Sequence, residues 1–250
     1  MPTRLTTPNL LSLLFIFYCL GACPLVFAQE FDDPSQTSLE AKDYTKIFHQ
    51  TKIDAERGDP KAAGNLGLLY QKGLGTSAND RLALEWLTRG AKKGDASAQN
   101  NLGFLYFKGI GVKQNYTQAL KWFQKAADQD LASAQTNLGL MYGAGLGVAQ
   151  DHAKALEYFR KAAEQDDVDA QVNLAMMYSL GEGTSQNNVE AYKWFYLALQ
   201  HVISEDEKKA EIRDDIQWLE KHMKNEDIDL ARQKASAWKP APSGQDPKQK

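Results

Sequence analysis

The chain has 250 residues, 43% of them hydrophobic and 24% charged, which is the composition of a folded protein and not of a disordered one. Its formal net charge is −3 and its isoelectric point is near 5.9, with Lys and Arg spread among acidic residues. The sequence therefore lacks the basic stretches that nucleic-acid-binding proteins carry.

Residues 1–28 resemble a secretory signal peptide. An apolar run from Leu10 to Leu20 follows a single positive residue, Arg4, and precedes small residues. The run is shorter than the ~20 apolar residues of a membrane-spanning helix. Cleavage after Ala28 is favoured, and the alternative is a lipobox that would leave a lipid anchor on Cys23. We therefore expect an exported protein, periplasmic in the first place, with secretion or lipid anchoring as alternatives.

Cleavage after Ala28 would remove both cysteines of the chain, Cys19 and Cys23. No disulfide can then form in the mature chain, so its fold must depend on core packing alone. Residues 29–43 are expected to form a linker that leads into the folded part.

From residue 44 onward the sequence repeats itself at a step of 36 residues. Each unit carries a leucine, then a tyrosine, then a glycine at fixed spacing. These positions are Leu66, Leu102, Leu138 and Leu174, then Tyr70, Tyr106, Tyr142 and Tyr178, then Gly73, Gly109, Gly145 and Gly181. A fixed period of this size is typical of helical solenoids, in which each unit contacts mainly its neighbours.

Each unit contains two segments with the apolar spacing of a helix, shown by Ala98 to Tyr106 and by Ala119 to Ala127. Each unit is therefore predicted to be an αα-hairpin. Cap residues stand where the helices should begin. They are Asn79, Asn115, Asp151 and Asn187 before the second helices, and Asp59, Asp95 and Asp167 before the first helices, where Leu131 interrupts the pattern.

Two further features of the repeat concern turns and packing. The pairs beginning at Gly73, Gly109, Gly145 and Gly181 should reverse the chain, whereas a phosphate-binding loop is disfavoured because no strand precedes them. A small residue after the repeated leucine should allow close helix contact. Bulky aromatic residues are expected in the core, at Trp86, Trp122, Tyr158 and Trp194.

The repeats are predicted to occupy residues 44–200, with residues 44–57 aligning with a second helix only. Residues 201–238 are expected to form C-terminal capping helices, because Ser204 with Glu207 makes a capping box and a helical apolar face follows. A last helix is expected from Leu230 to Trp238. The proline-containing residues 239–250 are expected to be a disordered tail.

The motif from Ala98 to Tyr106, the Gly-x-Gly loop and the motif from Ala119 to Ala127 together resemble the Sel1-like repeat, a relative of the tetratricopeptide repeat. This resemblance implies an all-α, right-handed αα-hairpin solenoid, a superhelix of about four repeats with helical caps. Proteins with similar repeats are mostly adaptors or regulators that hold other proteins. The chain lacks the repeated cysteines of one secreted branch, so the penicillin-binding activity of that branch is not expected here.

The first helices are expected to line the concave face of such an array. Four asparagines, which are poor residues for the middle of a helix, recur there in register and are called the asparagine ladder. They are Asn65, Asn101, Asn137 and Asn173. One interpretation is that they hold the backbone of a bound peptide, and the other is that they fix an adjacent unit or loop.

Other residues of the second and third units are predicted to form an amphipathic groove wall. They are Asn100, Phe104, Phe107 and Lys108, followed by Thr136 and Leu140. Phe107 is the most suggestive, because its counterparts Gln71, Gly143 and Ser179 are not aromatic and the repeat does not demand a ring there.

No catalytic or metal-binding constellation is predicted. The four histidines are scattered without metal-ligand spacing, no nucleophile elbow occurs, and the acidic residues fall at caps or helix surfaces. We therefore expect a non-catalytic interaction scaffold without cofactors, whose partner is another protein or a peptide segment. The alternatives are a regulatory subunit of an envelope enzyme or sensor, and a cell-wall hydrolase.

Overall fold

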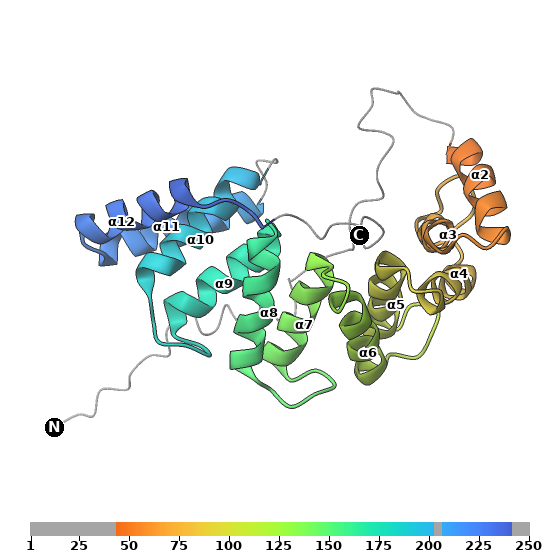
Figure 1. Cartoon of the computed structure of the whole chain (residues 1–250), viewed down its shortest axis with the longest axis horizontal. Coiled ribbons are helices and arrows are strands. Elements are labelled where there is room, and N and C mark those ends of the chain that lie inside the picture. The colour runs from red at the N-terminus through yellow and green to blue at the C-terminus, as the bar shows by residue number, and fades with distance from the viewer. Residues whose placement is uncertain (1–43, 203–206, 242–250) are drawn as a thin grey trace, which may run out of the picture. The chain divides into compact units, whose positions relative to one another are not determined.

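The computed structural model describes residues 44–202 and 207–241, and these residues form eleven α-helices and no strand (Figure 1). The helices are α2 (Tyr44–Glu56), α3 (Pro60–Lys72), α4 (Asp80–Lys92), α5 (Ala96–Lys108), α6 (Tyr116–Ala127), α7 (Ala132–Ala144), α8 (His152–Glu164), α9 (Val168–Leu180), α10 (Asn188–His201), α11 (Glu207–His222) and α12 (Asn225–Ala237). The predicted all-α hairpin fold is confirmed. The expected signal peptide, the expected linker, Ser204 of the expected capping box and residues 242–250 of the expected tail lie outside the described residues.

Contacts between residues divide the chain into two compact units. The described part of the N-terminal unit comprises residues 44–141 and 146–149, and therefore α2 to α6 with most of α7. The described part of the C-terminal unit comprises residues 142–145, 150–202 and 207–241, which include α8 to α12. Each unit is built from the same kind of helical hairpin.

The predicted caps begin the helices. Asn79 has an extended backbone, and its side-chain oxygen accepts the N–H of Leu82 at 3.0 Å. This satisfies one of the N–H groups that have no partner inside a helix. The same bond recurs at Asn115, Asp151, Asn187, Asp59, Asp95 and Asp167. At Leu131 only the backbone carbonyl accepts, from Ala134 and Gln135, so the predicted interruption is confirmed.

The glycine pairs close the first helices and join consecutive repeats. The first glycine of every pair has a left-handed backbone conformation, with φ between 67° and 78°, and Gly109 has the largest value, 78°. The second glycine makes a close approach: a Cβ added to Gly111 would lie 2.6 Å from the carbonyl oxygen of Asp80, in the first turn of α4. Gly75 approaches Tyr44 in the same way. Tyr44 thus stands where a second helix begins, which agrees with the alignment of α2 to second helices.

The repeated leucines form the core, with Leu66, Leu138 and Leu174 fully buried and Leu102 nearly so. The expected close contact also occurs, because a Cβ added to Gly103 would lie 2.8 Å from the ring of Phe123. The prediction for the bulky aromatics was only partly right. Trp86 and Trp194 are buried, whereas Trp122 and Tyr158 are half-buried.

The ring deepest in the core comes one residue later in the second helix, at Phe123, Phe159 and Phe195. Cations lie beside half-buried and buried rings alike: Lys125 Nζ is 4.2 Å from the centre of the Trp122 ring, and Lys193 Nζ is 4.1 Å from that of the buried Trp194. The neighbouring cation therefore does not decide which of these rings is buried.

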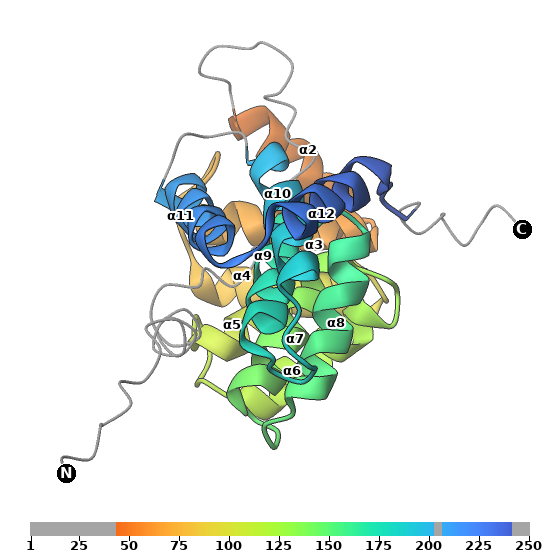
Figure 2. The same ribbon diagram turned by 90° about the vertical axis from the view of Figure 1, so that its left-hand side faces the viewer.

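In the C-terminal unit α10 contacts both α11 and α12, and Figure 2 shows the three helices together. Ile212, Ile216 and Leu219 bury the predicted apolar face of α11. The last helix begins at Asn225, earlier than the predicted Leu230. After α12, the N–H of Ala241 donates to the carbonyl of Glu164 at 2.6 Å, so the chain still contacts α8 at the beginning of the expected tail.

Candidate partner-binding site

The first helices of the N-terminal unit align polar, apolar and cationic residues on one side. Residues four apart along a helix lie on one face, as Asn100, Phe104 and Lys108 do on α5. We call this side the first-helix face, and its residues are Asn65, Leu68 and Lys72 of α3, Asn100, Phe104 and Lys108 of α5, and Ser133, Asn137 and Leu140 of α7. α3 contacts α5, and α5 is joined to α7 by a side-chain hydrogen bond described next.

Two asparagines connect α5 and α7. Asn137 Nδ2 donates to Asn100 Oδ1 at 2.9 Å, and neither side chain has exposed surface. Among the described residues the remaining amide nitrogen of Asn100 and the remaining amide oxygen of Asn137 have no hydrogen-bond partner. Turning both amides over would exchange these roles but would again leave one N–H donor and one C=O acceptor free. The pair therefore ties two helices together and leaves one donor and one acceptor unbonded beneath the surface, where a ligand reaches them only if the side chains above them move aside.

A third buried polar atom of the first-helix face, the hydroxyl oxygen of Ser133, also has no partner among the described residues. A buried polar group without a partner costs about 1–3 kcal/mol, so native proteins keep few of them. Three such atoms on neighbouring helices of one face indicate a place where a ligand or water completes the hydrogen bonds.

The asparagine ladder does not have one shared role. Asn137 bonds to Asn100, whereas Asn173, in the C-terminal unit, donates to the carbonyl of Asp169 in its own helix at 2.8 Å. Asn65 is half-buried and Asn101 is buried. The structure therefore brings Asn137 together with Asn100, which stands outside the ladder's register, and the repeated spacing alone did not indicate this pairing.

The predicted aromatic wall lies at the end of α5. Phe104 is buried, and Phe107 is half-buried with its ring 5.1 Å from that of Tyr116. Lys108 Nζ lies 6.0 Å from the Phe104 ring centre and 5.7 Å from that of Phe107. The Phe107 ring is thus partly covered by its own hairpin. On α7, Leu140 is buried, and Thr136 is fully buried with its hydroxyl donating to the carbonyl of Ala132.

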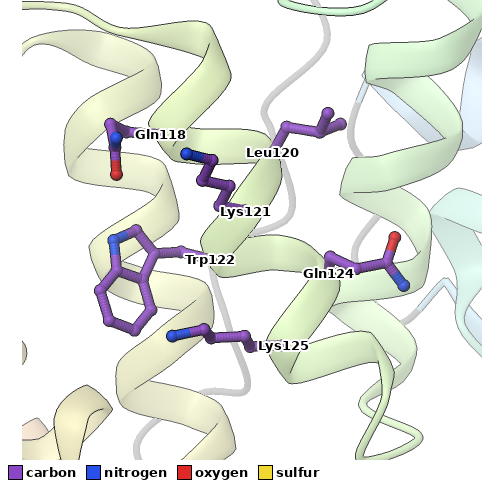
Figure 3. A pocket seen from close by; sticks show the side chains of 6 residues that line it. All are labelled: Gln118, Leu120, Lys121, Trp122, Gln124 and Lys125. Atoms are coloured by element: carbon purple, nitrogen blue, oxygen red, sulfur yellow. The ribbon is translucent and has the colours of Figure 1, made fainter.

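A second candidate surface lies on α6 (Figure 3). Its pocket has a volume of about 340 Å³ and is lined by Gln118, Leu120, Lys121, Trp122, Gln124 and Lys125. In Figure 3 Gln118, Trp122 and Lys125 lie on one side of the helix, and Leu120 and Gln124 lie on the other. A pocket spread around one helix offers surface contact but few converging polar groups, so it is the weaker candidate for a specific site.

Repeated glutamines are structural residues that the sequence interpretation missed. Gln114 Nε2 donates to the carbonyl of Phe107 at 2.9 Å, and Gln150 and Gln186 make the equivalent bond in the next repeats. Gln99 Nε2 donates to the carbonyl of Ala91 at 3.2 Å, which joins α5 to the preceding α4. Both sets recur at the 36-residue step, and that recurrence was the available signal.

Two histidines of the C-terminal unit are paired with carboxylates, whereas the third, His222, stacks on the ring of Trp218. His152 Nδ1 is 3.6 Å from Glu182, and His201 Nδ1 is 2.7 Å from Asp166. Burial raises the pKa of Glu182, and His152 lowers it in part. No group of three or more His, Cys, Asp or Glu side chains that could hold a metal ion occurs among residues 44–202 and 207–241.

No helix in the described part of the chain combines the length and the apolar character that crossing a membrane requires.

The Sel1 repeat matches the chain at residues 60–95, 96–131, 132–167 and 168–201, which is more than half of its length. No curated protein matches the chain. Among solved structures, a Sel1 repeat protein from Oxalobacter formigenes is 32% identical with a TM-score of 0.57, and the match covers 63% of this chain and 65% of that protein.

A second structure is c5321, a protective antigen of uropathogenic Escherichia coli that displays an SLR fold. It is 27% identical with a TM-score of 0.51, and the match covers 78% of this chain and 49% of that protein. The chain therefore spans about two thirds of the first of these proteins and half of the second. With four matched repeats and helical hairpins at each of them, the chain belongs to the Sel1 repeat family.

Proposed function

We propose that the chain is an exported, non-catalytic scaffold that binds an extended segment of another protein on its first-helix face. Sel1 repeat proteins are in general scaffolds for protein interactions. The proposal adds a site to that general role, and it adds export, which is supported by the signal-like sequence of residues 1–28.

The observation that carries the proposal is the free donor and the free acceptor of the Asn100–Asn137 pair. A peptide backbone in extended conformation presents one C=O and one N–H group per residue. An amide nitrogen and an amide oxygen side by side match these groups, whatever the side chains of the ligand are. Recognition of the backbone favours an unfolded segment over a folded surface, because a folded partner has already used its backbone groups.

Apolar side chains beside the pair can receive the side chains of such a segment. Phe104 lies one turn after Asn100 on α5, and Leu140 lies nearly one turn after Asn137 on α7. Phe107 is half-exposed at the end of α5. Buried aromatic and aliphatic anchors around a few polar groups are the usual composition of a binding site.

Affinity capture from a periplasmic extract tests the proposal, with captured proteins identified by mass spectrometry and then titrated by calorimetry. The double variant Asn100→Ala with Asn137→Ala should weaken binding of the captured partner by about tenfold or more, because it removes both hydrogen bonds to the backbone. The matched control is Asn173→Ala, which removes a ladder asparagine that bonds to its own helix.

Thermal unfolding of each variant separates loss of the site from loss of the fold. The site assignment is wrong if the double variant stays folded and binds the same partner with unchanged affinity. Sequencing of the mature N-terminus tests export separately: a mature chain beginning at Gln29, or one beginning at a lipid-modified Cys23, supports it. An unprocessed N-terminus in a cytoplasmic fraction contradicts it.

A further inference from the structure

The N-terminal unit has an excess of positive charge that the whole chain does not show. Residues 44–141 contain 13 Lys and Arg residues against 8 Asp and Glu residues, a net charge of +5, whereas the formal charge of the full sequence is −3. A field of one sign over one unit attracts ligands of the opposite sign and raises their association rate.

The positive charge reaches the first-helix face, where the helices themselves carry no acid and the acids beside them are the N-caps Asp59 and Asp95. α3, α5 and α7 contain Lys61, Lys72 and Lys108 but no Asp or Glu. Lys72 and Lys108 occupy equivalent positions in successive repeats, and both are exposed. Within the part of the chain that the structure describes, neither of them forms an ion pair with a carboxylate.

Lys108 also lies close to the other groups of the proposed site. It stands two turns after Asn100 on the same side of α5, with Phe104 between them. Its ammonium group is 6.0 Å from the Phe104 ring centre and 5.7 Å from that of Phe107. A carboxylate bound there would face a cation beside two apolar rings, where water is partly excluded and the attraction is stronger than in bulk solvent.

From these observations we infer that the partner of the first-helix face is an acidic, extended segment of another protein. This inference depends on the proposed function and names the chemistry of its ligand. The backbone of the segment bonds to Asn100 and Asn137, an apolar side chain packs beside Phe104, and Asp or Glu side chains pair with Lys72 and Lys108. Lysine in the last turn of a helix also offsets the helix dipole, and the test below is designed to separate that role from binding.

The test uses fluorescence anisotropy with three labelled peptides that differ only in charge. Each contains alternating Leu and Phe residues separated by Glu, by Gln or by Lys. Full-length protein should bind the Glu peptide about tenfold tighter than the Gln peptide at about 50 mM salt, and the preference should shrink at about 300 mM salt. The Lys peptide should bind more weakly than the Gln peptide.

Lys72→Glu with Lys108→Glu should abolish or reverse the preference for the Glu peptide while thermal unfolding shows that the protein is folded. The matched control reverses two exposed cations of α4, Arg81→Glu with Lys92→Glu, and should leave most of the preference intact. Equal effects of the two double variants mean that only the overall charge matters, which overturns the site assignment. If the wild-type protein binds the Glu, Gln and Lys peptides equally well, the inference of an acidic ligand is wrong.

Asn100→Ala with Asn137→Ala distinguishes this inference from the function on which it depends. Suppose that this variant loses binding of all three peptides and that the wild type shows no preference for charge. The first-helix face is then still a peptide-binding site, but its ligand is not acidic.

The alternative occupant of the first-helix face is an acidic segment of the same chain, with Glu30, Asp32, Asp33, Glu40 and Asp43. If the Glu peptide binds only after these five are replaced by Gln and Asn, the assignment to another protein is wrong.

Discussion

The two units share one repeat pattern but carry opposite net charges. The N-terminal unit has a net charge of +5, whereas residues 142–241 hold 12 Lys and Arg residues against 18 Asp and Glu residues, a net charge of −6. On the first helix α9 of the C-terminal unit, Asp169 pairs with Lys208 and its carbonyl accepts from Asn173. On α5 and α7 the Asn100–Asn137 pair keeps a donor and an acceptor without a partner, and on α9 the side-chain oxygen of Gln171 is in the same condition among the described residues.

The C-terminal unit uses its charges to attach the last helices. Tyr192 of α10 donates to Glu220 of α11 at 2.8 Å and accepts from Arg232 of α12 at 3.0 Å. Burial opposes ionisation of Glu190, but the ammonium groups of Lys234 and Lys193 outweigh it and lower its pKa. The contrast teaches that one hairpin repeat can attach further helices where its charged side chains pair internally, and can present cations such as Lys72 and Lys108, unpaired among the described residues, where they do not.

The largest expected effect comes from removing a core phenylalanine from each unit, and it tests whether the two cores are equivalent. Phe123 and Phe159 are buried almost completely at the same repeat position, one in each unit. Each change to Ala should lower the free energy of unfolding by about 3–5 kcal/mol, because it removes apolar burial and leaves a cavity. Urea denaturation followed by circular dichroism measures the loss, and hydrogen exchange should locate it in the N-terminal unit for Phe123→Ala and in the C-terminal unit for Phe159→Ala.

Conservative variants at the same two positions serve as controls for that experiment. Phe123→Leu and Phe159→Leu keep most of the volume and should cost much less than the changes to Ala. A loss below about 1 kcal/mol for either Ala variant would show that the two units do not share one kind of core.

The next largest effect concerns the buried carboxyl group of Asp215 in the negatively charged C-terminal unit and its influence on stability at different pH values. Burial, together with the neighbouring carboxylates Glu211 and Asp214, raises the pKa of Asp215 from its usual value of 3.8 to about 6. The folded state then binds the proton more tightly than the unfolded state, so this group lowers stability as the pH rises from about 4 to about 6. Asp215→Asn should raise the free energy of unfolding at pH 7 by about 1–2 kcal/mol, after allowance for partial solvent screening.

Urea denaturation at pH 4 and pH 7 checks this sign. The Asn variant should be more stable than the wild type at pH 7 and close to it at pH 4, where Asp215 is protonated in the folded protein. Asp229→Asn, which changes an exposed carboxylate of α12 that is not among the causes of the Asp215 shift, is the control and should change the difference between the two pH values far less. A stability gain that is equal at both pH values would contradict ionisation of Asp215 as the cause.

Much of the fold was predictable because the signals that set it are local. Asn79 caps α4 through a bond to a residue three positions later, and Gly73 ends α3 through its own left-handed backbone. The pairing of Asn137 with Asn100 was not predictable, because it joins side chains 37 residues apart and depends on how two helices are rotated against each other. The rotation of α6 about its own axis likewise decides that Phe123, and not the adjacent Trp122, points deepest into the core.

The smallest expected effect comes from giving the first repeat the glutamine hydrogen bond of the later repeats. Gln114 and Gln150 each donate to a backbone carbonyl of their own hairpin, at 2.9 and 2.7 Å, whereas the first repeat has Ala78 at this position. Ala78→Gln should add the same bond to the carbonyl of Gln71 and raise the free energy of unfolding by about 0.5–1 kcal/mol, the net value of one exposed hydrogen bond. Urea denaturation with an unchanged m value measures it. Ala78→Glu has nearly the same size without the N–H donor, so an equal gain from Glu would attribute the effect to side-chain packing and not to the hydrogen bond.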